Sequence, residues 1–139
     1  MSLLLHPQAK AVIVDDALRC FPNECCGFFF GRKDGDLRAV TKAQPVTNAK
    51  EGDQRRRFEI HPIDYMKAER YALEQGLELL GVYHSHPLHP AIPSEHDRAV
   101  ALPEFSYIIA SVQPDAVEAI TSWRLNEDRQ FDPEEVREP

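Results

Sequence analysis

Two histidines and an aspartate within one short segment could together hold a metal ion. The segment, residues 81–97, reads GVYHSHPLHPAIPSEHD. His84 and His86 lie two apart at the end of an apolar strand. Because residues two apart in a strand point to the same face, both imidazoles can reach one ion if the extended backbone continues through them. Asp97 follows after a loop long enough to fold back and bring its carboxylate beside them. Two imidazoles and one carboxylate leave an open position on a tetrahedral zinc ion, which lowers the pKa of a bound water to about 7 and supplies hydroxide at neutral pH.

The same segment has two interpretations that need no metal. Ser94 and Asp97 have the spacing of a helix capping box, in which the two side chains satisfy backbone N–H groups at the start of a helix. Pro87, Pro90 and Pro93 are spaced three apart, which suits a polyproline II segment that docks on a partner protein. An H-x-H pair alone is weak evidence for a metal, so the spacing leaves these interpretations open.

Length, composition and charge limit the classes of protein to which the chain can belong. Its 139 residues suit one domain, and 42% apolar with 28% charged residues is ordinary for a globular protein. The 16 basic and 23 acidic residues give a net charge of −7, which disfavours binding to nucleic acid and to a membrane surface. No apolar run approaches the roughly 20 residues of a membrane span, and the N-terminus lacks the features of a signal peptide.

The three cysteines, Cys20, Cys25 and Cys26, are clustered and odd in number. This pattern does not suggest a disulfide framework, so we expect a reduced protein in the cytoplasm. Small buried thiols are the simplest interpretation of the cluster. A cysteine peptidase built on Cys25 or Cys26 is an alternative. Activity that survives the removal of zinc would favour it.

The elements that must position these residues follow from the hydrophobic pattern. Apolar residues at helical spacing predict a helix over 7–20, and His61-Pro62 opens a second helix that ends at Gly76. The apolar run from Cys25 to Gly31 predicts a buried strand. The remaining predicted elements are strands at 37–46, 58–60, 77–83, 105–112 and 116–125, a mobile loop at 48–57, a proline-rich loop at 84–93, a short helix from 94 and a fraying acidic tail at 126–139. This order favours an α/β domain with a mixed sheet flanked by helices.

The histidine segment also resembles the signature of a known family. JAMM (MPN-plus) metalloproteases share the pattern H-x-H-P, five residues, then P-S-x-x-D, and residues 84–97 carry it without a gap or a substitution. The family has a glutamate before a glycine-containing strand, and Glu24 in NECCGFFFG, residues 23–31, looks like that element. The segments RFEI at 57–60 and SWR at 122–124 extend the resemblance, so we assign residues 1–125 to a JAMM domain and residues 126–139 to the tail.

The resemblance implies a fold, a cofactor and a role for each site residue. The implied MPN fold is a single α/β domain with a mixed, curved sheet between helices, related to cytidine deaminases. One Zn²⁺ per chain would be bound by His84, His86 and Asp97, with water at the fourth position. Glu24 would be the general base that takes the water proton and returns it to the leaving amine, and Ser94 would donate a hydrogen bond to the oxyanion.

The short chain looks most like the small bacterial JAMM proteins that act on ubiquitin-like sulfur-carrier proteins. These enzymes hydrolyse the amide bond after the carrier's C-terminal Gly-Gly and release a residue such as cysteine. The basic run from Arg55 to Arg57 would then hold an acidic surface or the tail of the carrier. Nothing in the sequence specifies an oligomeric state.

Two other classes of protein remain as alternatives. A non-catalytic MPN interaction module usually lacks the metal ligands, whereas this chain has every motif position. A zinc nucleoside deaminase needs an H-x-E or C-x-E segment and a P-C-x-x-C segment. Position 86 is His86 rather than glutamate, and the chain has no P-C-x-x-C.

Overall fold

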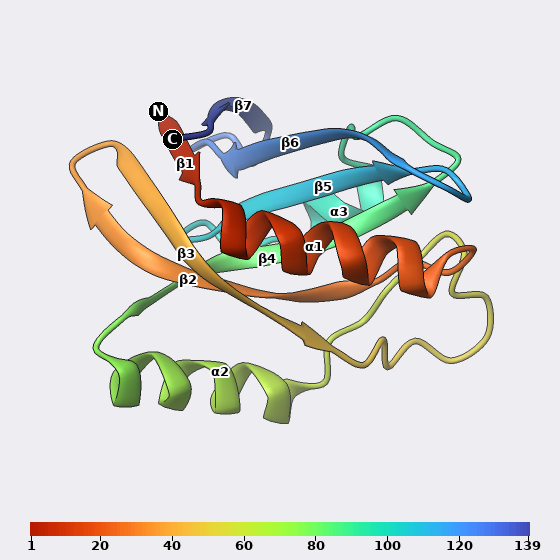
Figure 1. Cartoon of the computed structure of the whole chain (residues 1–139), viewed down its shortest axis with the longest axis horizontal. Coiled ribbons are helices and arrows are strands. Elements are labelled where there is room, and N and C mark those ends of the chain that lie inside the picture. The colour runs from red at the N-terminus through yellow and green to blue at the C-terminus, as the bar shows by residue number, and fades with distance from the viewer.

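The long helices follow the predicted hydrophobic pattern in the computed structural model, which describes all 139 residues (Figure 1). Helix α1 (Pro7–Cys20) begins at a proline that suits the first turn, and it buries Ile13 and Ala17. Helix α2 (Pro62–Gln75) ends at Gly76, whose φ of 65° lies in the left-handed region that glycine adopts without steric penalty. Both helix predictions are confirmed. No helix combines the length and the apolar character needed to span a bilayer.

Seven strands form one sheet that closes into a barrel in the order β1-β3-β2-β4-β5-β6-β7. The strands are β1 (Ser2–Leu5), β2 (Cys26–Asp34), β3 (Leu37–Val46), β4 (Glu78–Pro87), β5 (Ser106–Val112), β6 (Val117–Leu125) and β7 (Phe131–Arg137). β1 runs parallel to β3 and β7, β4 runs parallel to β5, and the other neighbours are antiparallel. The predicted α/β domain with a mixed, curved sheet is therefore confirmed, and β1 is a strand that the sequence did not predict.

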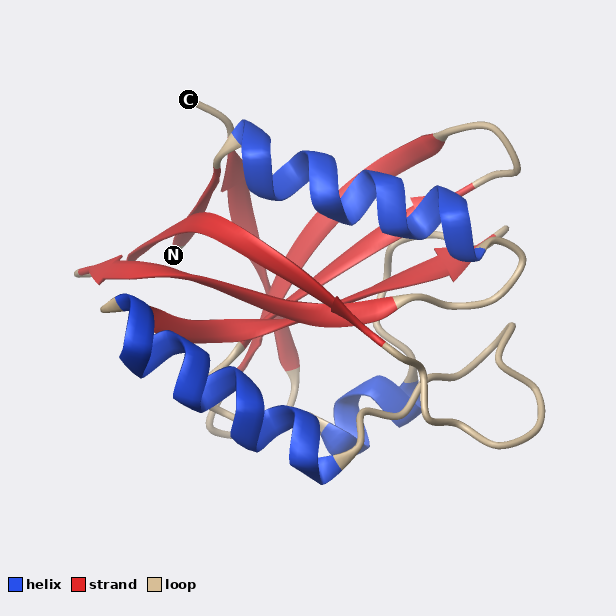
Figure 2. Ribbon diagram, turned by 60° about the horizontal axis from the view of Figure 1, so that its bottom comes forward, coloured by secondary structure: helices blue, strands red, loops and turns tan.

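The three consecutive phenylalanines of β2 serve the cores on both faces of the sheet. Phe29 belongs to the apolar cluster that includes Ile13 of α1, whereas Phe28 and Phe30 belong to the cluster that includes Ala68 of α2. Figures 1 and 2 show α1 and α2 on opposite sides of the sheet to which β2 belongs. Because side chains alternate between the faces of a strand, a strand covered on both faces is apolar at every position.

Two segments near the histidines differ from the prediction. β4 continues through both histidines to Pro87, because residues 84–87 pair with β5. Residues 58–60 form no strand. Phe58 stacks its ring on His84, with the ring centroids 4.5 Å apart. Helix α3 (Glu95–Val100) begins after Ser94, as predicted.

The prediction that residues 126–139 form a fraying tail is wrong, because residues 131–137 form β7. β7 pairs with β6 and with β1, and these pairings close the barrel. Glu134 of β7 is buried, accepts hydrogen bonds from the hydroxyls of Ser106 and Ser122 at 2.8 Å and forms an ion pair with Arg124. The acidic composition suggested a solvated tail, but side chains of β5 and β6 that lie 10 to 28 residues earlier in the sequence satisfy this buried carboxylate.

Candidate metal centre

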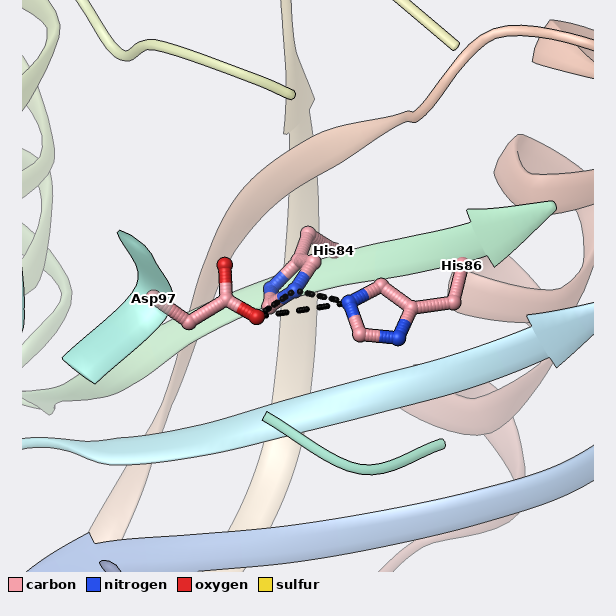
Figure 3. Close-up of side chains that lie close together, drawn as sticks. All are labelled: His84, His86 and Asp97. Carbon is pink, nitrogen blue, oxygen red and sulfur yellow. Dashed lines mark hydrogen bonds and ion pairs between the residues drawn. The ribbon is translucent and has the colours of Figure 1, made fainter. Parts of the chain in front are cut away.

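The end of β4 and the start of α3 bring three potential metal ligands together (Figure 3). The Nε2 atoms of His84 and His86 are 3.1 Å apart, and each lies 3.3 Å from Oδ2 of Asp97. Zinc bonds of about 2.0–2.1 Å require neighbouring ligand atoms of a tetrahedron to be about 3.3–3.4 Å apart. The three atoms therefore have the spacing of one face of a zinc tetrahedron, and the residues fit the ion that the sequence predicts.

Contacts behind the ligands hold two of them in orientation. The Nδ1–H of His86 donates to the carbonyl of Pro90 at 2.9 Å, which leaves Nε2 free to bind a metal. The backbone N–H of Ser94 donates to Oδ2 of Asp97 at 2.9 Å, and the backbone N–H of Asp97 donates to Oγ of Ser94 at 3.0 Å. The capping box and the metal site are therefore compatible, because one carboxylate caps the helix and also faces both imidazoles.

The electrostatic environment suits a cation. Burial disfavours the ionised form of Asp97, but hydrogen bonds from His84 and His86 outweigh it and hold the pKa of this carboxyl well below its ordinary range. Burial lowers the pKa of His84. Burial also acts to lower the pKa of His86, but its hydrogen bonds to Asp97 and to the carbonyl of Pro90 raise it overall. At neutral pH the site thus provides an ionised carboxylate and a neutral His84, as a metal requires.

Glu24 and Ser94 lie at one cavity with His86. The cavity has a volume of about 420 Å³, and its lining residues are Glu24, Arg56, His86, His89, Pro90, Ile92 and Ser94. Glu24 precedes β2 and is only 5% exposed. Burial, helped by the charge of Asp97, raises the pKa of its carboxyl to about 8 against the opposing charges of His86 and Arg57. A carboxyl that titrates near neutral pH is suited to take up and return a proton.

Three residues that support the site were missed in the sequence. The backbone N–H of Glu24 donates to the carbonyl of Gln54 at 2.8 Å, and Nδ2 of Asn48 donates to the carbonyl of Glu24 at 3.2 Å. Phe58 stacks on His84, whose buried Nδ1 has no hydrogen-bond partner. The polar composition of residues 48–57 predicted only a mobile loop, and no local pattern could link Asn48 to a residue 24 positions away.

The cysteines are free thiols in the structure, as their odd number suggested. Cys25 and Cys26 are buried, and burial raises the pKa of both thiols, that of Cys26 to about 12. Since a nucleophilic cysteine must be ionised and accessible, these two residues are poor candidates for a peptidase nucleophile. They act as small apolar side chains of the core.

Fold and site together define a metal-dependent hydrolase, because three ligands can hold the cation while a separate carboxyl is free to move a proton. The model of prokaryotic homologs of the JAB domain matches residues 6–126. The chain therefore belongs to this family and is a metalloprotease of the JAMM type, as the signature at residues 84–97 predicts.

Three named relatives are similar over much of the chain. The desampylase of Haloferax volcanii is 34% identical over 111 residues, which cover 79% of this chain and 76% of that protein. The desampylase of Pyrococcus furiosus is 35% identical over 96 residues, or 69% of this chain and 64% of that protein. A probable TtuB-protein conjugate cleaving protease of Thermus thermophilus is 33% identical over 92 residues, or 66% of this chain and 58% of that protein. The similarity to the last two thus spans less than two thirds of their length.

Two solution structures share the fold over nearly the whole chain. A protein from Desulfitobacterium hafniense superimposes with a TM-score of 0.86 and 31% identity, covering 99% of this chain and 92% of that chain. A protein from Salinibacter ruber gives a TM-score of 0.73 and 38% identity, covering 100% of this chain and 92% of that chain. The similarity to both includes the C-terminal strand that the sequence did not predict.

Proposed function

We propose that the protein is a zinc-dependent peptidase that hydrolyses the amide bond after the C-terminal Gly-Gly of a ubiquitin-like sulfur-carrier protein, with cysteine as one candidate for the released residue. The observation that carries the proposal is the tetrahedral spacing of three ligand atoms beside a buried carboxyl. The relatives are named for cleaving conjugates of small ubiquitin-like carriers, and we extend this substrate class to the chain. We assign the activity to the cytoplasm, as the free thiols favour.

Each residue at the site has a separate role in the proposed reaction. His84, His86 and Asp97 would hold the zinc ion, which when bound lowers the pKa of water and polarises the scissile carbonyl. Glu24, starting as the carboxylate, takes a proton from the attacking water and gives it to the leaving amine, so it is regenerated after each turnover. Oγ of Ser94 accepts the N–H of Asp97, which leaves its own hydroxyl hydrogen free to be donated to the oxyanion of the scissile carbonyl.

An unpaired strand edge supports binding of an extended carrier tail. β1 pairs only with residues 37–40 of β3, so residues 41–46 have β2 on one edge and no strand on the other. Val46 and Thr47 line a second cavity, of about 690 Å³, to which Glu24 also contributes. A Gly-Gly tail added to this edge as an extra strand would lead its last carbonyl towards Glu24, and glycine would leave room beside the metal.

Basic side chains at the mouth of the site offer a contact for an acidic carrier. Arg55 and Arg56 are exposed, and Arg56 lines the cavity of about 420 Å³. Reversing both charges, Arg55→Glu with Arg56→Glu, should raise the KM for a carrier conjugate about tenfold and leave kcat near its original value. Arg32→Glu, at an exposed position of β2, is the matched control. An unchanged KM in the double variant would remove these residues from carrier binding.

The deciding experiment incubates zinc-loaded protein with carrier–amino-acid conjugates and follows their intact mass. We expect loss of the amino acid from the conjugate, and no loss after a chelator has removed the zinc. Glu24→Gln should keep about one zinc ion per chain and lose hydrolysis, whereas His84→Ala and His86→Ala should lose the zinc. Full zinc content in both histidine variants, or normal turnover by Glu24→Gln, would overturn the proposal.

A further inference from the structure

One side-chain amide, that of Asn48, uses all of its hydrogen-bonding capacity at the base of the loop beside the site. Its Nδ2 donates to the carbonyl oxygens of Glu24 and Arg57, each at 3.2 Å. Its Oδ1 accepts from the backbone N–H groups of Lys50 at 3.0 Å and Glu59 at 3.1 Å. An asparagine carboxamide offers two donors and two main acceptor positions, so every one of them is paired here.

Gln54 joins the same loop to Glu24 by a second route. Its Nε2 donates to the carbonyl of Asn48 at 3.1 Å and to that of Lys50 at 2.9 Å. The backbone carbonyl of Gln54 accepts a hydrogen bond from the backbone N–H of Glu24 at 2.8 Å. Both backbone polar groups of Glu24 are therefore bonded to this loop. Asn48 makes one of the two bonds with its side chain, and its backbone carbonyl accepts a hydrogen bond from Gln54, which makes the other.

The pairing of the sheet does not by itself fix Glu24. β2 begins at Cys26, and bonds to β4 extend one residue further, since Cys25 donates its N–H to Oγ of Ser85 at 2.8 Å and accepts the N–H of Ser85 at 3.2 Å. The backbone N–H and carbonyl of Glu24 are bonded to no strand. At Glu24, hydrogen bonds to the loop at residues 48–57 replace those of the sheet. We propose that Asn48 is a positioning residue, whose carboxamide fixes the backbone of Glu24 and thereby the place from which the Glu24 carboxyl reaches the substrate.

The catalytic consequence rests on the proposed function, whereas the attachment is a property of the fold. Misplacing a reacting group by about 1 Å can cost about a hundredfold in rate. A residue that sets the backbone of a general base therefore affects kcat. Asn48 also lines the cavity of about 690 Å³, but its side-chain amide has no hydrogen-bonding position left for a substrate, so the effect is expected in kcat rather than in KM.

Two variants and a control separate positioning of Glu24 from folding of the loop. Asn48→Ala removes all four side-chain hydrogen bonds. Asn48→Asp keeps an oxygen that can accept from the two loop N–H groups but loses both donors, including the one to Glu24. Asn126→Ala is the matched control, because Oδ1 of Asn126 also accepts two backbone N–H groups, in the turn between β6 and β7, without contact to Glu24.

Amide hydrogen exchange, measured by NMR on the zinc-loaded protein, tests the attachment without any substrate. Both Asn48 variants are expected to lower the protection of the Glu24 amide about tenfold or more, and to leave the amide of Ile109 in β5 unchanged. Asn126→Ala is expected to leave both amides unchanged. Unchanged protection of Glu24 in Asn48→Asp would overturn the proposal. An equal loss at Ile109 would also overturn it, since Asn48 would then act on global stability.

Steady-state kinetics with a carrier conjugate test the consequence for turnover. Both Asn48 variants are expected to lower kcat about tenfold to a hundredfold, with KM within about twofold and zinc content unchanged. A raised KM with full kcat would overturn the positioning role and assign Asn48 to substrate binding. If the original protein cleaves no conjugate, the proposed function fails, and the exchange of the Glu24 amide still decides the structural role of Asn48.

Discussion

Replacing Glu24 by glutamine should stabilise the metal-free protein, and by more as the pH rises. Burial raises the pKa of this carboxyl from its ordinary 4.5 to about 8. Well below pH 4.5 the carboxyl is protonated in the folded and the unfolded chain alike. Between pH 4.5 and 8 the unfolded chain releases the proton while the folded chain keeps it, so the free energy of unfolding falls as the pH rises. Glutamine does not titrate, and the variant does not suffer this loss.

The size of the effect follows from the difference between the two pKa values. One pH unit between them corresponds to about 1.4 kcal/mol, so the full loss is about 5 kcal/mol. From pH 5 to pH 9 the advantage of Glu24→Gln should grow by about 4 kcal/mol. This is a large share of the roughly 5–15 kcal/mol that stabilises a typical domain. Bound zinc favours the carboxylate and should reduce the pH dependence.

The assay is urea unfolding of chelator-treated protein at pH 5, 7 and 9, followed by the fluorescence of Trp123, the only tryptophan. Glu69→Gln is the control, because Glu69 is exposed on α2 and its carboxylate is in water in both states. The control should differ from the original protein by the same amount at each pH. A pH-dependent change of less than about 1 kcal/mol for Glu24→Gln would refute the conclusion that burial governs this carboxyl.

Three further predictions concern the framework of the site. Glu134→Ala should lower the free energy of unfolding by about 3–5 kcal/mol in urea titrations, because it leaves Arg124 of β6, whose side chain is 14% exposed, without its buried carboxylate partner. A loss below about 1 kcal/mol would mean that β7 does not depend on this pair. Gly81→Ala should destabilise the protein by about 3 kcal/mol or more in the same measurement, because the new Cβ would lie 1.8 Å from the carbonyl oxygen of Ser106 and push β4 from β5. An unchanged stability would contradict this close packing. Phe58→Ala should weaken zinc binding about tenfold to a hundredfold, measured in competition with a chelator, because the ring stacked on His84 is lost. An unchanged zinc affinity would assign Phe58 to packing alone.

Much of the fold could be predicted because its signals are local. The apolar stripe of α1, the left-handed Gly76 after α2 and the hairpin of β2 and β3 each depend on residues a few positions apart. The prediction of β7 failed for the opposite reason. Its sequence, FDPEEVR, reads as a polar tail, and the partners that satisfy Glu134 lie on strands formed by earlier segments.

The same distinction applies to the site. Two features of the site could be predicted from neighbouring residues alone. His84 and His86 are two apart, which in extended backbone directs both side chains to one side, and the capping pattern predicts the helix start at Ser94 that orients Asp97. The convergence of the three ligand atoms at zinc spacing, and the burial of Glu24 beside them, depend on how distant segments pack. Only the tertiary structure revealed that Asn48 and Gln54 hold the backbone of Glu24. The physical reason is that local hydrogen-bonding patterns are encoded in neighbouring residues, whereas burial and convergence depend on which distant segments pack together.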